Sequence, residues 1–370
     1  MTACRLCHVP LVTRVLNLGE QPPSDLFPLG GSPDDDPTAP LELWMCERCL
    51  LVQLGSARFP EEMPLAVESS TMIRLGRTAV TEVLGRCGLA RGARVAEAAS
   101  HHGGSWLPHL AEAGMQARSL DDARDGVDLL VDVHALAHME DTAGALRARA
   151  SALSPFGWLV LEFHHLLPLV RQGQFDAVRH GHPVYLSLLA LQPALEEVGL
   201  SVKDVTSSDA FGGSIRVYCR RDAVTSDAVD ELLRQERSAG LGDAAALSDL
   251  QRRAARSSKA MSDYLARARA AGRRIAGYGA PSKASVLLRH AGITCALLPF
   301  TADLSPAKQG RRLGGTDIPI VSPQQLLEYR PNDVLIFTWD IAAEIVGQLG
   351  AVTLWGGRFM VPIPELREVG

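Results

Sequence analysis

The sequence has no continuous block of Lys and Arg: 37 basic residues are balanced by 42 acidic ones, and the net charge is -5. Because nucleic-acid binding depends on clustered positive charge, this balance argues against a nucleic-acid partner. The chain also lacks any run of about eighteen apolar residues and a basic-then-apolar N-terminus, so neither a membrane span nor export is expected. We therefore expect a cytoplasmic protein that acts on a small molecule.

The chain has 370 residues, of which 46% are hydrophobic and 21% charged, and this composition predicts two or three soluble globular domains. Four of its seven cysteines fall into two close pairs. In a reducing compartment such pairs indicate a metal site more than disulfides. The other three, Cys87, Cys219 and Cys295, stand alone in apolar or strand-like settings, and we expect buried thiols there.

The two cysteine pairs are Cys4-Arg-Leu-Cys7 and Cys46-Glu-Arg-Cys49. A tetrahedral zinc site needs four soft ligands from two tight turns, and paired CxxC motifs supply them. Residues 1–60 are rich in Pro and Asp and cannot easily build a core, so zinc would stabilise them. The alternative is four buried or redox-active thiols. We predict a zinc-binding module over residues 1–60.

Residues 61–222 predict a trimmed Rossmann-like domain. A helix is expected over residues 61–90. Residues 94–104 predict a strand followed by a turn and the start of a helix. In folds of this kind the cofactor approaches the backbone of that turn. The next strands are expected at 115–120 and 127–133. Only about half a dozen residues separate them, whereas a complete crossover needs roughly thirty. We therefore expect the intervening helix and strand to be missing.

Polar side chains follow two of the predicted strands. His134 and His138 follow the strand at 127–133, and Arg179, His180 and His182 lie in the segment after the strand at 158–161. Since the carboxyl ends of parallel strands line the ligand crevice, these residues are candidates for a catalytic cleft. The alternative is a polar loop whose imidazoles are satisfied by local hydrogen bonds.

Residues 223–370 predict linking helices and a second Rossmann-like lobe. The strand-turn-helix at 274–283 carries Gly277 and Gly279 before a helix N-terminus, a pattern typical of an anion cradle, with Lys283 placed to offset phosphate charge. Trp339 ends a later strand at 331–339, where it could stack on a substrate or cover the core.

Several motifs resemble the zinc-containing nucleotide-sugar C-methyltransferases: Leu16–Pro22, Gln174-Phe-Asp176, Tyr185-Leu-Ser187, Gly277–Lys283 and Thr316–Ile320. The resemblance implies an α/β chain with an N-terminal zinc module, a class I S-adenosylmethionine (SAM) fold and a C-terminal Rossmann-like substrate lobe. It also implies a small-molecule substrate such as a nucleotide-sugar. The implied chemistry is proton abstraction next to a keto group, followed by capture of a methyl group from SAM.

The resemblance also implies site residues. His182 occupies the position of the family's catalytic base, and the further catalytic candidates are Arg179, His180 and His138. The implied cofactor residues are Glu97, Ala99, Ser100, Gly103, Asp121 and His134. The implied substrate residues are Tyr185, Ser214, Arg216, Tyr278, Gly279, Lys283, Lys308 and Trp339. The implied ligands of a structural zinc are Cys4, Cys7, Cys46 and Cys49.

The sequence departs from the family at several of these positions. Gly181 replaces a Glu and Arg179 a Tyr in the active-site segment, and Ala99 and His102 replace a Gly and an Asp of the cofactor turn. Together with the missing crossover, these changes predict weak or absent SAM affinity. Three functions stay open: a SAM-dependent C-methyltransferase of natural-product biosynthesis, a SAM-independent enzyme of isomerisation, elimination or cyclisation, and a non-catalytic binding subunit.

Overall fold

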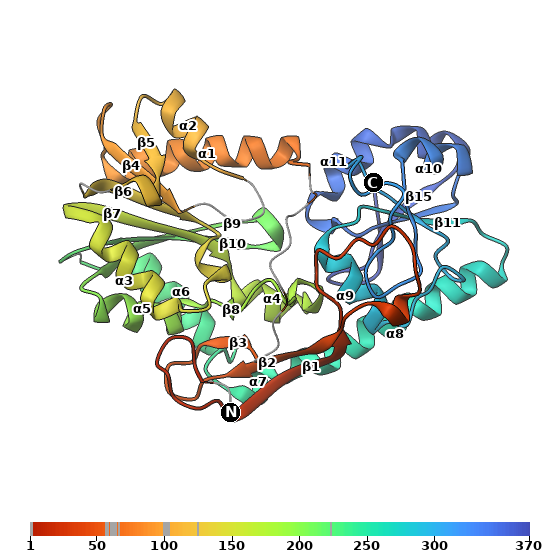
Figure 1. Cartoon of the computed structure of the whole chain (residues 1–370), viewed down its shortest axis with the longest axis horizontal. Helices are drawn as coiled ribbons and strands as arrows, with labels where there is room; N and C mark the ends of the chain where they lie inside the picture. The colour runs from red at the N-terminus through yellow and green to blue at the C-terminus, as the bar shows by residue number, and fades with distance from the viewer. Residues whose placement is uncertain are drawn as a thin grey trace.

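The computed structural model of the chain describes residues 3–55, 59, 65, 67–98, 104–123, 126–222 and 224–370. Its strands form three sheets, one near the N-terminus, one in the middle of the chain and one in its C-terminal part. Figure 1 shows the middle sheet and the C-terminal lobe side by side, with strands β1 and β2 running beneath them. This mixed α/β architecture agrees with the predicted fold class.

The N-terminal sheet is antiparallel, with the order β1-β2-β3-β8. Its strands are β1 (Thr13–Gln21), β2 (Ala39–Met45), β3 (Val52–Leu54) and β8 (Val184–Tyr185). Strand β8 belongs to residues 61–222, which were predicted to form the middle domain. The Leu54 N–H also donates to the Pro183 carbonyl (2.9 Å). The sheet therefore connects the cysteine-bearing segment to the residues that directly follow His182.

The middle sheet has the order β5-β4-β6-β7-β10-β9. Its parallel strands are β5 (Gln116–Ser119), β4 (Arg94–Ala98), β6 (Val127–Val133) and β7 (Leu153–His164), followed by the antiparallel β10 (Ser214–Arg220) and β9 (Ser201–Ser208). In the usual doubly wound order another strand lies outside the second one. Here β5 is the edge in the described part of the chain, and residues 120–126 alone connect it to β6. The predicted loss of this crossover is confirmed.

Helices cover both faces of the middle sheet (Figure 1). Helix α1 (Ser70–Cys87) begins where the Ser69 hydroxyl accepts the Met72 N–H (3.2 Å), and it ends at Gly88, whose φ is 63°. The prediction of a helix from residue 61 was therefore wrong for residues 67–69, which are not helical. The other helices of this domain are α2 (Leu107–Glu112), α3 (Thr142–Ala152), α4 (Leu166–Gln172) and α5 (Leu188–Glu197).

Three helices lead from the middle domain to the C-terminal lobe: α6 (Asp227–Ser238), α7 (Ala244–Leu247) and α8 (Asp249–Ala270). In α8 the buried side chains recur every three or four residues for much of its length, so the helix presents one apolar face to the core. Near its start, Gln251 Oε1 accepts the N–H of Asn17 in β1 (2.8 Å). The helix thus contacts the N-terminal sheet, in line with the linking helices predicted at the start of residues 223–370.

The C-terminal sheet has the order β13-β12-β11-β14-β15-β16, and only the β15–β16 pair is antiparallel. Its strands are β13 (Ile320–Val321), β12 (Thr301–Ala302), β11 (Ile275–Tyr278), β14 (Asp333–Ile336), β15 (Arg358–Val361) and β16 (Arg367–Val369). The main helices are α9 (Ser282–His290), α10 (Pro323–Tyr329) and α11 (Ala342–Gln348). The strand-turn-helix predicted at 274–283 is β11 followed by α9.

Strand β10 begins at Ser214, because residues 211–213 all have positive φ, which a strand does not allow. One local prediction needs correction. Cys295 is exposed, not buried, and its thiol donates to Asp317 Oδ2 (2.9 Å).

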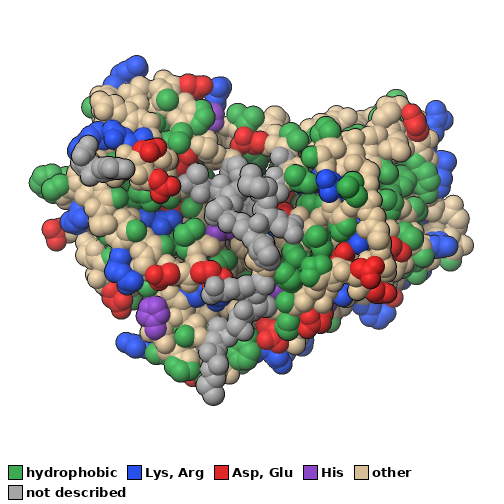
Figure 2. Space-filling view, viewed as in Figure 1, with side chains coloured by type: hydrophobic (Ala, Val, Ile, Leu, Met, Phe, Trp, Pro, Cys, Tyr) green, Lys and Arg blue, Asp and Glu red, His purple; other side chains and the backbone are tan. Residues whose placement is uncertain are grey.

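The surface agrees with the absence of a basic block. Figure 2 shows acidic and basic side chains interspersed over one face of the molecule. Among the described residues, no helix is long and apolar enough to span a membrane.

Candidate functional site

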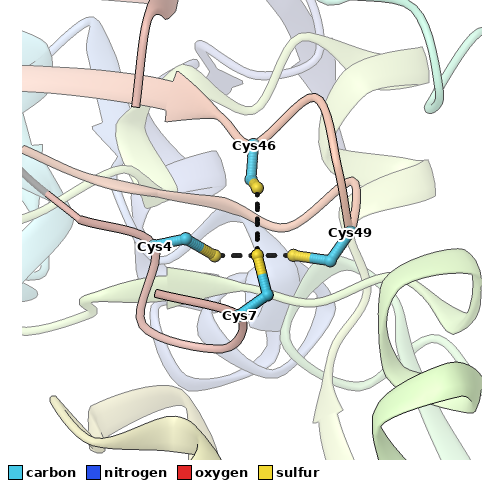
Figure 3. A group of neighbouring side chains, drawn as sticks. All are labelled: Cys4, Cys7, Cys46 and Cys49. Atoms are coloured by element: carbon cyan, nitrogen blue, oxygen red, sulfur yellow. Dashed lines mark hydrogen bonds between the residues drawn. The ribbon is translucent and has the colours of Figure 1, made fainter. Parts of the chain in front are cut away.

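Four cysteine thiols converge beside the N-terminal sheet (Figure 3). Each CxxC forms a similar turn: the His8 N–H donates to the Cys4 carbonyl and the Leu50 N–H to the Cys46 carbonyl, and both donors have a φ near 60°. All four sulfur atoms lie within 4.8 Å of one another. Sulfurs around a tetrahedral zinc at about 2.3 Å would be roughly 3.8 Å apart, so the cluster fits a zinc ion with no open coordination position.

A cavity of about 310 Å³ lies between the carboxyl ends of β6 and β7 and the C-terminal lobe. The size is at the small end of the range for small-molecule sites. Its walls bring together residues from all three parts of the chain. The lining side chains that can carry ionic or acid–base chemistry are Asp25, Glu68, His134, His138, Glu162, His164, Arg179, His182, Lys283, Lys308 and Asp340.

The turn after β6 places His134 on the cavity wall. Asp132 holds this turn, because its Oδ1 accepts the N–H groups of Ala135 (2.9 Å) and Leu136 (3.0 Å), and Arg149 from α3 pairs with its Oδ2. His134 itself has a φ of 59°, an uncommon conformation for a residue with a large side chain. Such backbone strain is often found at functional sites.

His134 faces a buried carboxylate. Its Nε2 lies 3.5 Å from Glu162 Oε1, and Arg216 binds the other oxygen of Glu162 while also reaching Glu82 on α1 (2.5 Å). Burial alone would raise the pKa of Glu162, but His134 and Arg216 outweigh it, and the pKa lies below its usual value. Arg216, a predicted substrate residue, thus lies behind the cavity wall and keeps Glu162 ionised.

Three of the predicted catalytic residues form one cluster. Arg179 Nη2 lies 2.6 Å from His182 Nε2, and because a guanidinium only donates, His182 is neutral and accepts at this nitrogen. His138 donates from Nδ1 to the Gly181 carbonyl (2.7 Å). The rings of His138 and His182 meet edge to face, with centroids 4.5 Å apart. The cluster therefore joins the turn after β6 to the segment before β8.

Two other predicted residues of this segment lie away from the cavity lining. The Tyr185 hydroxyl is buried and accepts the Arg179 N–H (2.9 Å), so it positions Arg179. His180 points to the N-terminal sheet, where its Nε2 donates to the Ala39 carbonyl (3.3 Å) and its ring packs edge-on against Phe59. Burial lowers the pKa of His180. Its contacts are those of a structural histidine.

The wall toward the C-terminal lobe contains a second histidine and an indole. His164 donates from Nε2 to Gln174 Oε1 (2.9 Å), and burial lowers its pKa to about 4, so it is neutral at pH 7. Trp339 donates from Nε1 to Asp176 Oδ2 (2.8 Å). Asp176 is fully buried, and burial raises its pKa. Trp339 is therefore held with one edge on Asp176 while it lines the cavity.

The remaining predicted substrate residues divide between the cavity and the core. Lys283 and Lys308 line the cavity. Gly279 lies in the turn between β11 and α9, with a φ of 87°. Ser214 is buried and donates to the Ala210 carbonyl (3.0 Å), and Tyr278 is buried in β11; neither of these two lines the cavity.

The predicted cofactor residues lie mostly after β4 and β5. Glu97 is buried, and its two oxygens accept the Ser105 hydroxyl and the Trp106 N–H (both 2.6 Å), which fixes the start of α2. Burial raises the pKa of Glu97. Asp121 follows β5 and does not line the cavity. The predicted residues outside the described part of the chain are Ala99, Ser100 and Gly103.

The cavity wall around His134 fits part of a SAM molecule. Met72 and Trp106 give it apolar surface, and Gly104, with a φ of 80°, allows close approach of a ligand. The wall lies at the carboxyl end of β6 and next to the start of α2, and cofactors bind at the carboxyl ends of the strands in doubly wound sheets. On the adenine side β5 is the edge of the described sheet. These residues therefore fit the amino-acid and sulfonium end of SAM better than the adenine end.

Comparison with known proteins assigns the family. Over 99% of its length the chain is 30% identical to C-methyltransferase NovU of Streptomyces niveus, and the match covers 96% of that protein. The chain belongs to the C-methyltransferase family. Within it, residues 209–364 match the family model "C-methyltransferase C-terminal domain", and residues 4–63 match the model "Putative zinc binding domain". The second match supports the zinc assignment of the cysteine cluster.

Two solved methyltransferase structures are more distant. Magnesium protoporphyrin IX methyltransferase of Synechocystis PCC 6803 is 18% identical, with a TM-score of 0.34 over 42% of this chain and 90% of that one. A TehB-like SAM-dependent methyltransferase of Corynebacterium glutamicum is 16% identical, with a TM-score of 0.29 over 40% of this chain and 88% of that one.

Some cavity residues of this family member were absent from the predicted site. Glu162 and His164 end strand β7, so the strand-end rule that selected His134 and His138 could also have found them. Asp340 follows Trp339 directly and could have been found in the same way. Asp25 lies in a Pro-rich loop without a local signal, and only the tertiary structure places it at the cavity.

Proposed function

We infer that this member of the C-methyltransferase family transfers a methyl group from SAM to a carbon next to a carbonyl group, in a small natural-product intermediate of the deoxysugar type. The contact between Arg179 and His182 on the cavity wall is the observation that supports this most. A neutral imidazole can accept a proton from an activated C–H group, and a guanidinium can stabilise the negative charge that develops on oxygen.

In the structure Arg179 occupies the lone pair of His182 Nε2. A substrate carbonyl that accepts a hydrogen bond from Arg179 would release this lone pair. The proton then passes from carbon to Nε2, the C–H electron pair forms a new C=C bond, and negative charge settles on the oxygen beside Arg179. When bound, SAM supplies an electrophilic methyl group for the resulting enolate carbon.

Neighbouring residues hold this arrangement in place. Tyr185 fixes the backbone of Arg179, and His138 fixes the carbonyl of Gly181, so both ends of the segment are anchored. Placing the imidazole and guanidinium in advance lowers the cost of organising them in the transition state. The ionised Glu162 behind His134 and the carboxylate of Glu68 favour a cation at the cavity wall around His134. The sulfonium of SAM is such a cation.

Trideuteromethyl-SAM provides the test. We would incubate the protein with this donor and a small-molecule extract of the organism that encodes it, and analyse labelled compounds by mass spectrometry. The expected result is a new compound with the label on carbon, formed by the parent and by His180→Ala, and much reduced with His182→Ala. Absence of any labelled compound, or a label on oxygen or nitrogen only, would contradict the proposal.

A second function is favoured by one observation, the position of β5 at the edge of the sheet in the described part of the chain. If the adenine side is too open to retain SAM, the same base and guanidinium would still support enolisation, and the chain would catalyse isomerisation, elimination or cyclisation without a methyl donor. Binding of S-adenosylhomocysteine separates the two functions, because only the methyltransferase requires it.

A further inference from the structure

The last residue of β7, His164, has one ring nitrogen whose protonation the protein fixes. Gln174 is fully buried, and its Nε2 donates to the Gly212 carbonyl (2.7 Å) and to Gln172 Oε1 (2.9 Å). Because a backbone carbonyl only accepts, the amide of Gln174 must turn Nε2 toward Gly212 and Oε1 toward His164. His164 Nε2 lies 2.9 Å from this oxygen, so Nε2 carries the proton of the hydrogen bond.

The other ring nitrogen of His164, Nδ1, keeps a lone pair as long as the ring is neutral. Burial lowers the pKa of His164 to about 4, and the nearby charges of Lys283 and Asp340 act on it in opposite directions, so the ring is neutral at pH 7. A neutral imidazole with its proton on Nε2 can only accept a hydrogen bond at Nδ1. His164 therefore offers an uncharged acceptor.

The lone pair of His164 is accessible from the cavity. Among the described residues, Nδ1 has no hydrogen-bond partner. The described histidine nitrogens that are buried without a partner belong to His109, His134 and His180, and Nδ1 of His164 is not one of them. The ring lines the cavity, so its exposed nitrogen can accept a hydrogen bond from a ligand there.

His164 lies on the side of the cavity away from the wall that fits SAM. That wall lies at the end of β6 and the start of α2, and β7 is the next strand after β6 in the order β5-β4-β6-β7. Toward the C-terminal lobe, Lys283 pairs with Asp340 (2.6 Å) and lies 4.1 Å from the centre of the Trp339 ring. An indole, a neutralised ion pair and an uncharged acceptor together suit a hydroxylated ring.

We propose that His164 Nδ1 accepts a hydrogen bond from a hydroxyl group on the sugar ring of the substrate, and that this bond orients the ring while its carbonyl lies at Arg179. The sugar and its carbonyl rest on the proposed function, whereas the acceptor rests on the hydrogen bonds of Gln174 and the place of the ring in the cavity. His164 is thus a substrate-binding residue, whereas His182 moves the proton.

Long-range proton–nitrogen NMR of the zinc-loaded full-length protein, with isotopically labelled histidine, tests the protonation of the ring. The signals of His164 are assigned by their absence from His164→Leu and His164→Asn. At pH 7 we expect a protonated Nε2 and an unprotonated Nδ1. A proton on Nδ1, alone or in an imidazolium, would overturn the inference, because the ring would then donate to the cavity.

Isothermal titration calorimetry tests the contact with the sugar. The probes are thymidine diphosphate glucose and thymidine diphosphate, which lacks the sugar. His164→Leu should bind the first probe about three- to tenfold more weakly than the parent, as expected for one lost hydrogen bond, and the second equally well. His164→Asn keeps an acceptor near the position of Nδ1 and should retain most of the affinity. His109→Leu is the matched control, because His109 is also half-buried but does not line the cavity.

Each variant must first unfold cooperatively at a temperature near that of the parent. Equal affinity of His164→Leu and the parent for thymidine diphosphate glucose would overturn the inference, and so would equal weakening for both probes, since the effect would then be structural. Absence of saturable binding of thymidine diphosphate glucose by the parent would overturn it as well. None of these measurements uses SAM, so they can fail while methyl transfer stands, and methyl transfer can fail while they stand.

Discussion

The ion pair between Asp36 and Arg312 anchors the loop that carries Asp25, and its removal should cost measurable stability. Arg312 Nη1 and Nη2 lie 2.6 and 2.7 Å from the two oxygens of Asp36, and the Gly315 N–H donates to the same carboxylate (2.6 Å). The two side chains are only 9% and 6% exposed. Asp36→Ala therefore leaves a nearly buried guanidinium without its counter-ion.

Breaking a buried pair in this way costs about 3 to 5 kcal/mol. The lower figure is appropriate here, because Arg312 keeps hydrogen bonds to the carbonyls of Ser32 and Thr316 (both 3.1 Å). The entropy of unfolding scales to about 0.8 kcal/mol per degree for a chain of this length, so a loss of about 3 kcal/mol lowers the Tm by roughly 4 °C.

Thermal unfolding of a double-mutant cycle provides the assay. Arg312→Met removes the buried charge, so the double variant should be less destabilised than the sum of the single variants. Burial alone would raise the pKa of Asp36, but the hydrogen bonds from Arg312 and the Gly315 N–H outweigh it and hold the pKa below its usual value. The coupling is therefore complete above about pH 4 and is lost as the pH falls through the folded-state pKa. A Tm for Asp36→Ala within one degree of the parent, or additive single effects, would refute this reasoning.

Three further predictions follow from the site and its supports. Elemental analysis should find one zinc per chain, and Cys46→Ser should lose it and lower the Tm more than it changes any chemical step; native protein without zinc would contradict this. His182→Ala should lower turnover by about a hundredfold with folding intact, whereas His180→Ala should have little effect; equal activities would exclude His182 as the base. Glu236→Ala should destabilise the fold by about 3 kcal/mol, because this buried carboxylate accepts hydrogen bonds from His165 (2.6 Å) and the start of α5; a smaller loss than for an exposed control such as Glu231→Ala would contradict it.

Features set by covalent spacing were predictable from the sequence. Two CxxC pairs can form two turns that face one another, and the structure brings their sulfurs within 4.8 Å. The few residues before Val127 cannot contain a helix and a strand, and the structure accordingly has β5 at the sheet edge in its described part. The cluster of His138, Arg179 and His182 followed from the rule that strand ends meet at one edge.

Features that depend on contacts between distant segments were not predictable in the same way. Strand β8 pairs with β3, about 130 residues earlier in the chain, and the two-residue strand carries no pattern that specifies this partner. Likewise, the sequence of the β11–α9 turn indicates an anion cradle, but Asp25 and Asp303 reach it only through the tertiary fold. Local sequence specifies the conformation of this turn, whereas the side chains that contact it depend on the tertiary fold.

Binding of S-adenosylhomocysteine to the zinc-loaded protein, measured by isothermal titration calorimetry, tests the central claim most directly. We expect a C-methyltransferase with fewer elements on the adenine-binding side of its sheet to bind one molecule per chain saturably but weakly. The expected Kd is roughly 0.1 to 1 mM, at the weak end of the range for enzyme ligands. Absence of saturable heat at millimolar concentrations, in protein that contains zinc and unfolds cooperatively, would contradict methyl transfer by this chain.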